Sequence, residues 1–273
     1  KNKNGGKKTN KGSRVRQTAA QLVMLSGLLS LPLFASELPT GATVVSGSAT
    51  ISSDASALTV NQSSDALITN WQSFSIGTDN SVTFNQPTST SVALNRVVGQ
   101  DTSQILGNLN ANGQVFLLNP NGIIIGTTGS VQTGAFVAST LNISNEDFLA
   151  ANYNFSGSEG SIVNNGSLSG AVVALIAPSV SNGENGTITG PISSDVALAA
   201  GTNMLLDFDG DGLISIEVQA STVSTLVDNQ GLIQADGGLV ILSAQGASDV
   251  LKGVVNNTGT IQANTIGSEN GRI

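Results

Sequence analysis

The segment IVNNGSLSG, Ile162–Gly170, decides the fold class of this chain, because three later segments repeat its plan. In each of them an apolar pair leads through asparagine to glycine and then into a strand that alternates apolar and polar residues. The three later copies are VSNGENGTITG (Val180–Gly190), LVDNQGLIQADG (Leu226–Gly237) and VVNNTGTIQAN (Val254–Asn264). A repeat of this kind predicts stacked structural units rather than one globular core.

The spacing of the repeats indicates the shape of one unit. Their common glycines, Gly166, Gly186, Gly231 and Gly259, are 20, 45 and 28 residues apart. A period near 20 fits one coil of a parallel β-solenoid, and we interpret the 45-residue interval as two units with an insertion. A coil cannot bury its inner face alone and therefore stacks on its neighbours. Asparagines at equivalent corners can then form a hydrogen-bonded ladder.

The remaining sequence also predicts an all-β fold. Short β-prone runs are separated by Asn, Gly, Ser and Asp, and two of these runs, VFLL and VVALIA, are apolar without alternation. Continuous apolar runs are expected for strands covered on both faces. A two-sheet sandwich is the structural alternative, and it would require hairpin turns at regular spacing. The single helix signal is SNEDFLA, Ser144–Ala150, in which Ser144 can act as the N-cap.

Charge is distributed unevenly along the chain. Seven of the ten basic residues fall within the first sixteen positions, and the apolar stretch Thr18–Ser36 follows them. This order is typical of a secretory signal peptide, with cleavage before Ser36. A membrane anchor is the alternative, against which Pro32 and the small residues at the end of the stretch argue. Residues 36–273 retain three basic and eighteen acidic residues, a net charge of −15, which disfavours binding to nucleic acid or anionic membrane.

The stretch Asn119-Pro120-Asn121-Gly122 matches a type I turn position by position. The first Asn can bond the backbone two residues on, Pro presets φ at the second position, and Gly tolerates positive φ at the fourth. These four residues contain no nucleophile and no base. The sequence therefore predicts a rigid corner, and whether a partner also reads that corner stays open at this point.

The segment around this corner, NGQVFLLNPNGIIIG, resembles the signature of the filamentous-haemagglutinin-type N-terminal secretion domain of two-partner secretion exoproteins. Three blocks follow the family's order, namely Asn70–Pro87, Ser91–Ile123 and Ala135–Gly157. The resemblance is strong over residues 37–157 and looser afterwards. A second family motif, Asn-Pro-Asn-Leu, has no copy in this chain, which places it in the branch without that motif.

The resemblance implies a right-handed parallel β-helix with a small N-terminal capping sheet. Residues 1–35 would be a signal peptide with an extended basic region, residues 36–160 the secretion domain core with its cap, and residues 161–273 further coils of a longer exoprotein. The soluble periplasmic domains of an outer-membrane transporter would recognise the module. The chain would cross the transporter unfolded, seed β-helix folding outside and end up secreted or on the cell surface, where the remainder of the exoprotein could contact host cells.

The resemblance also carries functional residues over to this chain. The recognition motif corresponds to Asn119, Pro120, Asn121, Gly122 and Ile123, and a second matching block contains Asn95 and Arg96.

Arg96 is a lone basic residue within an apolar strand, so we expect it to have a carboxylate or carbonyl partner. Asp101, five residues on, is the candidate. A structural ion pair and a place on the face that contacts the transporter remain alternatives.

The remaining polar clusters predict neither a metal site nor a cofactor. Asp207, Asp209 and Asp211 alternate as in the start of a calcium loop, but the twelfth position is Val218 and Glu217 comes one residue early. The chain contains no His and no Cys, which excludes the usual nucleophilic triads apart from a Ser–Lys pair at Lys252. We do not expect an enzyme. The alternatives are a self-contained β-solenoid adhesin that binds host glycan or protein and, further off, a polysaccharide-active β-helix enzyme.

Overall fold

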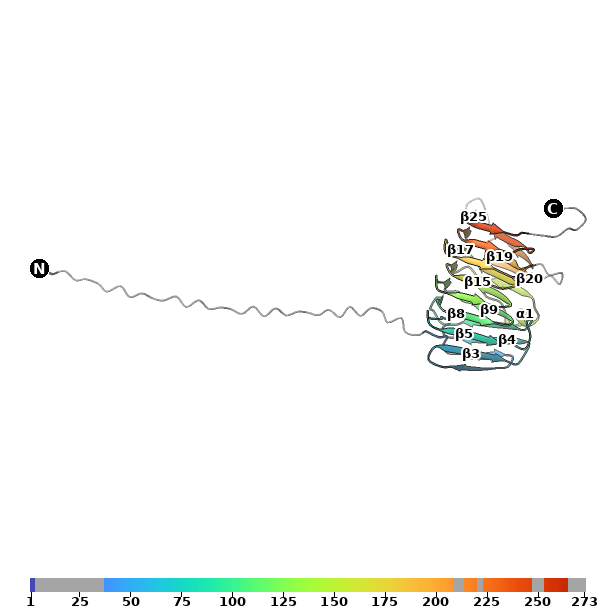
Figure 1. Cartoon of the computed structure of the whole chain (residues 1–273), viewed down its shortest axis with the longest axis horizontal. Coiled ribbons are helices and arrows are strands. Elements are labelled where there is room, and N and C mark those ends of the chain that lie inside the picture. The colour runs from blue at the N-terminus through green and yellow to red at the C-terminus, as the bar shows by residue number, and fades with distance from the viewer. Residues whose placement is uncertain (3–36, 209–213, 220–222, 247–252, 265–273) are drawn as a thin grey trace, which may run out of the picture. The chain divides into compact units, whose positions relative to one another are not determined.

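The computed structural model describes residues 1–2, 37–208, 214–219, 223–246 and 253–264, so most of the predicted signal peptide lies outside the described residues. From residue 37 on, the described strands stack as a parallel β-helix, and Figure 1 shows the successive coils rising from β3 to β25. Each coil pairs in parallel with its neighbours. The predicted all-β solenoid is therefore confirmed, and the sandwich alternative is wrong.

Three long sheets form the walls of the β-helix. The eight-stranded sheet contains β1 (Thr43–Ser46), β4 (Ala66–Trp71), β6 (Val92–Val97), β9 (Gln114–Leu118), β12 (Ala135–Ser139), β16 (Val172–Ala177), β19 (Asp195–Ala200) and β24 (Val240–Ala244). The six-stranded sheet contains β7 (Ser103–Ile105), β10 (Ile123–Ile125), β14 (Ser161–Asn164), β17 (Ser179–Asn182), β22 (Thr225–Asn229) and β25 (Gly253–Asn257). The nine-stranded sheet contains β2 (Ala49–Ser53), β3 (Ala57–Gln62), β5 (Ser81–Asn85), β8 (Asn108–Ala111), β11 (Ser130–Gln132), β15 (Ser167–Ser169), β18 (Thr187–Thr189), β23 (Leu232–Gln234) and β26 (Thr260–Gln262).

An antiparallel cap closes the N-terminal end of the β-helix. Strand β1 pairs antiparallel with β4, and β2 pairs antiparallel with β3. These are the first strands of the eight-stranded and nine-stranded sheets, so the cap covers the edges that the first full coil would otherwise expose. The expected N-terminal capping sheet is confirmed.

The pairing register of the strands confirms the Asn/Gly repeat but changes the interpretation of the interval between Gly186 and Gly231. Ile162, Val180, Val227 and Val255 are direct partners in successive strands of the six-stranded sheet. Strand β18 pairs directly with β23, so the 45-residue interval is one coil and the expectation of two units there is wrong. The additional length leaves the coil after β19 as the antiparallel pair β20 (Asn203–Phe208) and β21 (Ile214–Val218).

The predicted asparagine ladder runs through four coils at the corner that follows the six-stranded sheet. Its members are Asn164, Asn182, Asn229 and Asn257. Asn164 Nδ2 donates to Asn182 Oδ1 at 2.8 Å, Asn182 Nδ2 donates to Asn229 Oδ1 at 2.8 Å, and Asn229 Nδ2 donates to Asn257 Oδ1. The first three side chains are fully buried and cannot bond to water. The hydrogen bonds along the ladder take the place of the bonds to water that these amides lose on folding.

The strands of the eight-stranded sheet from β4 to β19 are buried on both faces, which explains their continuous apolar runs. Val115 and Leu117 point into the core enclosed by the three sheets. Phe116 and Leu118 point outward, into a second core beneath a cover. This cover consists of α1 (Asn145–Leu149), β13 (Tyr153–Ser156), β20 and β21, with β13, β20 and β21 forming an antiparallel three-stranded sheet.

A cluster of aromatic side chains from β9 and the cover fills the second core. Phe116 packs edge-on against Phe148 of α1, with ring centroids 5.4 Å apart, and also contacts Tyr153 and Phe208 of the cover. The helix begins as predicted, because Ser144 Oγ accepts a hydrogen bond from the backbone N–H of Asp147. The cover accommodates these rings outside the coil, while the inner core holds Trp71, Phe74, Phe84 and Phe136.

No helix in the described ranges is long and apolar enough to cross a membrane.

Candidate recognition corner

Residues Asn119 to Gly122 form the corner between β9 and β10. The backbone N–H of Gly122 donates to Asn119 O at 3.1 Å and closes a β-turn. Asn119 Oδ1 accepts from the backbone N–H of Asn121 at 2.9 Å, and Gly122 has a φ of +112°. Both local expectations, the side-chain bond two residues on and the positive φ at the fourth position, are confirmed.

The Asn119 side chain also fastens the corner to the preceding coil. Its Nδ2 donates to Asp101 O and to Ser103 Oγ, each at 2.9 Å. The side chain is fully buried, so its oxygen and its nitrogen are both satisfied within the protein. Asn121 adds a second tie, since its Nδ2 donates to Gly99 O at 3.0 Å.

The following coil packs against the other side of the corner. The backbone N–H of Asn119 donates to Ser139 O at 2.9 Å. Gly160 has a φ of +75°, and a Cβ at that position would lie 2.5 Å from Pro120 O. Residue 160 must therefore be glycine for two separate reasons, its backbone conformation and its close approach to the corner.

The corner has a buried half and an exposed half. Asn119, Gly122 and Ile123 are buried, and Ile123 belongs to the inner core. Pro120 and Asn121 are exposed. The buried half fixes the backbone, and the exposed half projects from it as a rigid edge.

Exposed apolar and acidic side chains lie next to this edge. Val98, which is 55% exposed, comes directly before Gly99, and Ile124 of β10 is 38% exposed. Asp101 and Glu159 are both exposed, and each adjoins a backbone segment that touches the corner. The surroundings of the corner are therefore partly apolar and negatively charged.

Asn95 from the second matching block is an interior residue. It lies on β6, is fully buried, and accepts a 2.9 Å hydrogen bond on Oδ1 from Trp71 Nε1. Its Nδ2 donates to Phe116 O at 3.3 Å on the next strand. Asn95 therefore provides the buried hydrogen-bond acceptor for Trp71, the single Trp of the chain, and does not reach the surface around the corner.

Arg96 points the other way, toward the cover. Its guanidinium donates to Asn142 Oδ1 at 3.0 Å, to Asn145 Oδ1 at 2.8 Å and to Ile143 O at 2.7 Å. The expectation of a carbonyl partner is confirmed, whereas the expected ion pair with Asp101 does not form. Burial lowers the pKa of the Arg96 guanidinium from its ordinary value.

The two motif blocks occupy neighbouring strands but point to different sides. Arg96 is the direct partner of Leu118, the residue before the corner. Asn95 nevertheless faces the inner core and Arg96 faces the cover, so neither joins the exposed edge of Pro120 and Asn121. The predicted site residues therefore lie in three different places. Asn95 is hydrogen-bonded inside the core, Arg96 bonds to the cover, and Pro120 and Asn121 are exposed at the corner.

Sequence reasoning missed the acceptors on the preceding coil. Asp101 and Ser103 lie 18 and 16 residues before Asn119, close to one coil length. The repeat period derived from the second half of the chain would have pointed to them, had it been extended to the first half.

The predicted weak metal candidate is only partly within the described residues. Asp207 lies on β20, while Asp209 and Asp211 lie outside the described residues. Among the residues that the structure describes, no group of three or more His, Cys, Asp or Glu side chains could hold a metal ion.

A family model described as the TPS secretion domain matches residues 35–273. Two curated proteins from Haemophilus influenzae, both named heme/hemopexin-binding protein, are 32% and 31% identical over 88% and 79% of this chain. The matched regions cover 27% and 25% of those proteins, so the chain spans about a quarter of their length.

Two solved structures share the fold. The HMW1 secretion domain from Haemophilus influenzae superposes with a TM-score of 0.73 at 32% identity, covering 84% of this chain and 60% of the other. The filamentous hemagglutinin secretion domain superposes with a TM-score of 0.52 at 13% identity, covering 84% of this chain and 99% of the other. The second likeness concerns the fold alone.

Proposed function

Because this chain belongs to the family of TPS secretion domains, we propose that the exposed edge of its Asn-Pro-Asn-Gly corner is read by the cognate transporter, while the buried half holds the coil together. TPS domains are recognised by an outer-membrane TpsB transporter, and TPS exoproteins are exported to the cell surface or the medium. We propose in addition that Pro120 and Asn121 are the surface residues that the transporter recognises.

One observation carries this proposal. Pro120 and Asn121 are exposed on a backbone that Asn119 fixes to both neighbouring coils. A partner that binds a pre-ordered edge loses little conformational entropy on binding. The exposed side chains of Val98 and Ile124 provide apolar area beside the edge.

The charge of the surroundings indicates the chemistry of the partner surface. Asp101 and Glu159 flank the corner, and Arg96, a basic residue of the described part of the module, points toward the cover instead. A neutral or basic patch on the periplasmic domains of the transporter would complement this surface. We also propose that residues 1–35 are the signal peptide, residues 36–160 the secretion core and residues 161–273 additional coils.

A secretion assay in cells that express the transporter tests the proposal. Pro120→Ala keeps the bonds of Asn119, so we expect normal folding but reduced export. Asn119→Ala breaks the corner, so we expect export and stability to fall together. Pro191→Ala is the matched control, because Pro191 is exposed and its carbonyl closes a turn to Ser194 at another corner. Export of Pro120→Ala at the level of Pro191→Ala would contradict a recognition role.

The names of the two curated relatives raise haem ligation as a second activity. This chain contains no His and no Cys, and its single Tyr, Tyr153, is buried. Met204 is buried as well. These are the side chains that ligate haem iron in proteins. We therefore assign this chain to export rather than to haem ligation, and we propose no catalytic role for it.

A further inference from the structure

We propose that a groove on the outer face of the nine-stranded sheet binds a neutral, hydroxyl-rich glycan. This face differs from the rest of the chain in its charge. None of the nine strands of this sheet, as the structure describes them, contains a charged residue. The chain as a whole has eighteen acidic residues. An uncharged face on such an acidic protein suits a ligand that has no charge of its own.

The outward side chains of this sheet form a regular polar row. Thr83, Asn110, Gln132 and Ser169 are direct partners on four successive strands. The row continues in register through Thr189, Gln234 and Gln262. Neighbouring strands are about 4.8 Å apart, a distance comparable with one sugar unit of an extended hexose chain. The part of the row from Thr83 to Ser169 can therefore present one hydroxyl or amide group to each successive sugar, whereas Gln234 further along already donates to Asp236.

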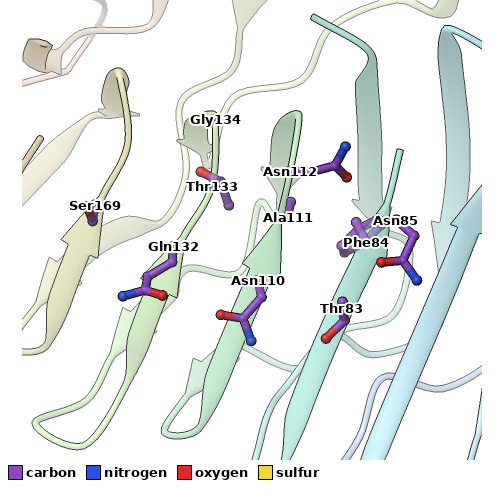
Figure 2. A pocket seen from close by; sticks show the side chains of 10 residues that line it. All are labelled: Thr83, Phe84, Asn85, Asn110, Ala111, Asn112, Gln132, Thr133, Gly134 and Ser169. Carbon is purple, nitrogen blue, oxygen red and sulfur yellow. The ribbon is translucent and has the colours of Figure 1, made fainter. Parts of the chain in front are cut away.

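A groove of about 470 Å³ lies over the first four strands of this row. Figure 2 shows Thr83, Asn110 and Gln132 side by side on adjacent strands, with Ser169 on the next. The hollow exists where Ala111 and Gly134 contribute no long side chain. Its volume falls within the range of small-molecule sites.

Part of the lining is rigid. The Asn112 side chain makes two hydrogen bonds to the backbone of Gln86. Its Oδ1 accepts from the Gln86 N–H at 2.7 Å, and its Nδ2 donates to the Gln86 carbonyl at 2.8 Å. Asn85 Nδ2 donates to Asn61 Oδ1 at 2.8 Å. These bonds fix the rim of the groove before any ligand arrives.

The rest of the lining retains hydrogen-bonding capacity. The side chains of Asn110 and Gln132 make no hydrogen bond to another described residue, and neither do those of Thr83 and Ser169. An amide can donate and accept at once, which matches a sugar hydroxyl that also does both. The groove therefore offers several donors and acceptors with no fixed charge.

The same features decide against an anionic glycan. The lining has no Lys or Arg to bind sulfate or carboxylate groups, and the acidic surface around it repels them. No aromatic ring stacks on the ligand, because Phe84 is buried beneath the sheet. Binding to one short oligosaccharide should therefore be weak, with a dissociation constant of about 1 mM, and a longer chain that follows the row should bind more tightly.

An NMR titration of the full chain tests this inference. The probe is a β-1,4-linked glucose tetramer, and a galacturonic acid tetramer serves as the anionic comparison. We expect the neutral tetramer to shift the side-chain amide signals of Asn110 and Gln132, and the anionic tetramer to leave them unchanged. Asn110→Ala and Gln132→Ala should each weaken binding about tenfold. Gln104→Ala is the matched control, because Gln104 is exposed on β7 in the six-stranded sheet.

Three results would overturn the inference. The first is an absence of shifts at Asn110 and Gln132 at the highest soluble concentration of the neutral tetramer. The second is equal or tighter binding of the anionic tetramer. The third is self-association of the ligand-free chain through this face, seen as a dimer in sedimentation that Gln132→Ala dissolves. Export of Gln132→Ala should remain at the wild-type level, so this test is independent of the recognition corner.

Discussion

Individual amide side chains hold the coils of this domain to one another. Asn119 bonds to Asp101 and Ser103 on the preceding coil, and Asn95 bonds to Trp71 on β4, the neighbouring strand in the sheet. Each amide is buried, and loss of one partner would leave the other without water. The predicted turn contacts within Asn119–Gly122 could be derived from the sequence because they are two and three residues apart. The contacts to Asp101 and Ser103 could not, because they depend on the register of one coil on the next.

Arg96 shows the same limit and leads to a test. The sequence predicts a carboxylate or carbonyl partner and offers Asp101 as the candidate, but the short hydrogen bonds go to the segment Asn142–Asn145, 46 to 49 residues away. A longer contact of 3.5 Å reaches Asn70 Oδ1. We expect Arg96→Met, which keeps most of the packing but removes the donors, to reduce the opening free energy of α1 by about 1.5–3 kcal/mol. Hydrogen exchange at the amides of α1 measures this change.

Arg96→Lys is the matched control, since it keeps the charge but loses the forked geometry. We expect it to have an intermediate effect. If exchange in α1 is the same in Arg96→Met and the wild type, Arg96 does not fasten the cover.

At the scale of the element, each coil consists of three short strands whose corners carry the specific residues. The repeat of Asn and Gly predicts the solenoid because each corner recurs in register. The spacing predicts two units within the 45-residue interval, which is wrong because the additional residues fold outside the coil as β20 and β21. Strand β20 alternates apolar and polar residues like a strand of a coil. Sequence spacing alone does not distinguish an additional coil from a side element.

The asparagine ladder permits a graded test. Asn182 lies in the buried middle of the ladder, between Asn164 and Asn229, whereas Asn257 is exposed at its end. We expect Asn182→Ala to lower the free energy of unfolding by about 2–4 kcal/mol, because it leaves the buried Asn164 Nδ2 donor and the buried Asn229 Oδ1 acceptor unpaired. Asn257→Ala should cost about 0.5–1 kcal/mol. Urea denaturation of both variants measures the difference, and equal losses would mean that the ladder does not act as a connected row.

The last described coil should respond to acid. Asp236 accepts from Gln234 Nε2 and from the backbone N–H of Asn264, which follows β26. The hydrogen bond from Gln234, and then that from Asn264, lowers the pKa of Asp236. A lowered folded-state pKa gives a stabilisation that is fully present above the ordinary aspartate pKa of about 3.9 and is lost as the pH falls through the folded-state pKa.

We therefore expect the amides of β26 to exchange faster, relative to those of inner strands, as the pH falls from about 5 to about 2. Exchange is compared after correction for its intrinsic pH dependence. Asp236→Asn removes the titrating group and serves as the control. If this variant shows the same acid loosening of β26, another carboxyl group is responsible.

For the whole molecule, stacking of coils combines a rigid scaffold with a surface that differs from side to side. The middle strands of the eight-stranded sheet are covered, the strands of the nine-stranded sheet carry no charged residue, and the corner after β9 exposes Pro120 and Asn121. Each coil pairs only with its neighbours, so a chain that emerges from a transporter can add coils one after another. The resemblance in the sequence predicted the family, and the division of the motif into buried and exposed halves required the packing.

The most direct test of the recognition claim is a binding measurement between the full chain and the periplasmic soluble domains of the transporter, with circular dichroism on each variant. We predict that Pro120→Ala keeps the β-sheet spectrum but binds about tenfold more weakly, while Asn119→Ala loses both binding and stability. If Pro120→Ala binds as tightly as the wild type and only Asn119→Ala fails, the corner serves folding alone and the proposed recognition edge is wrong.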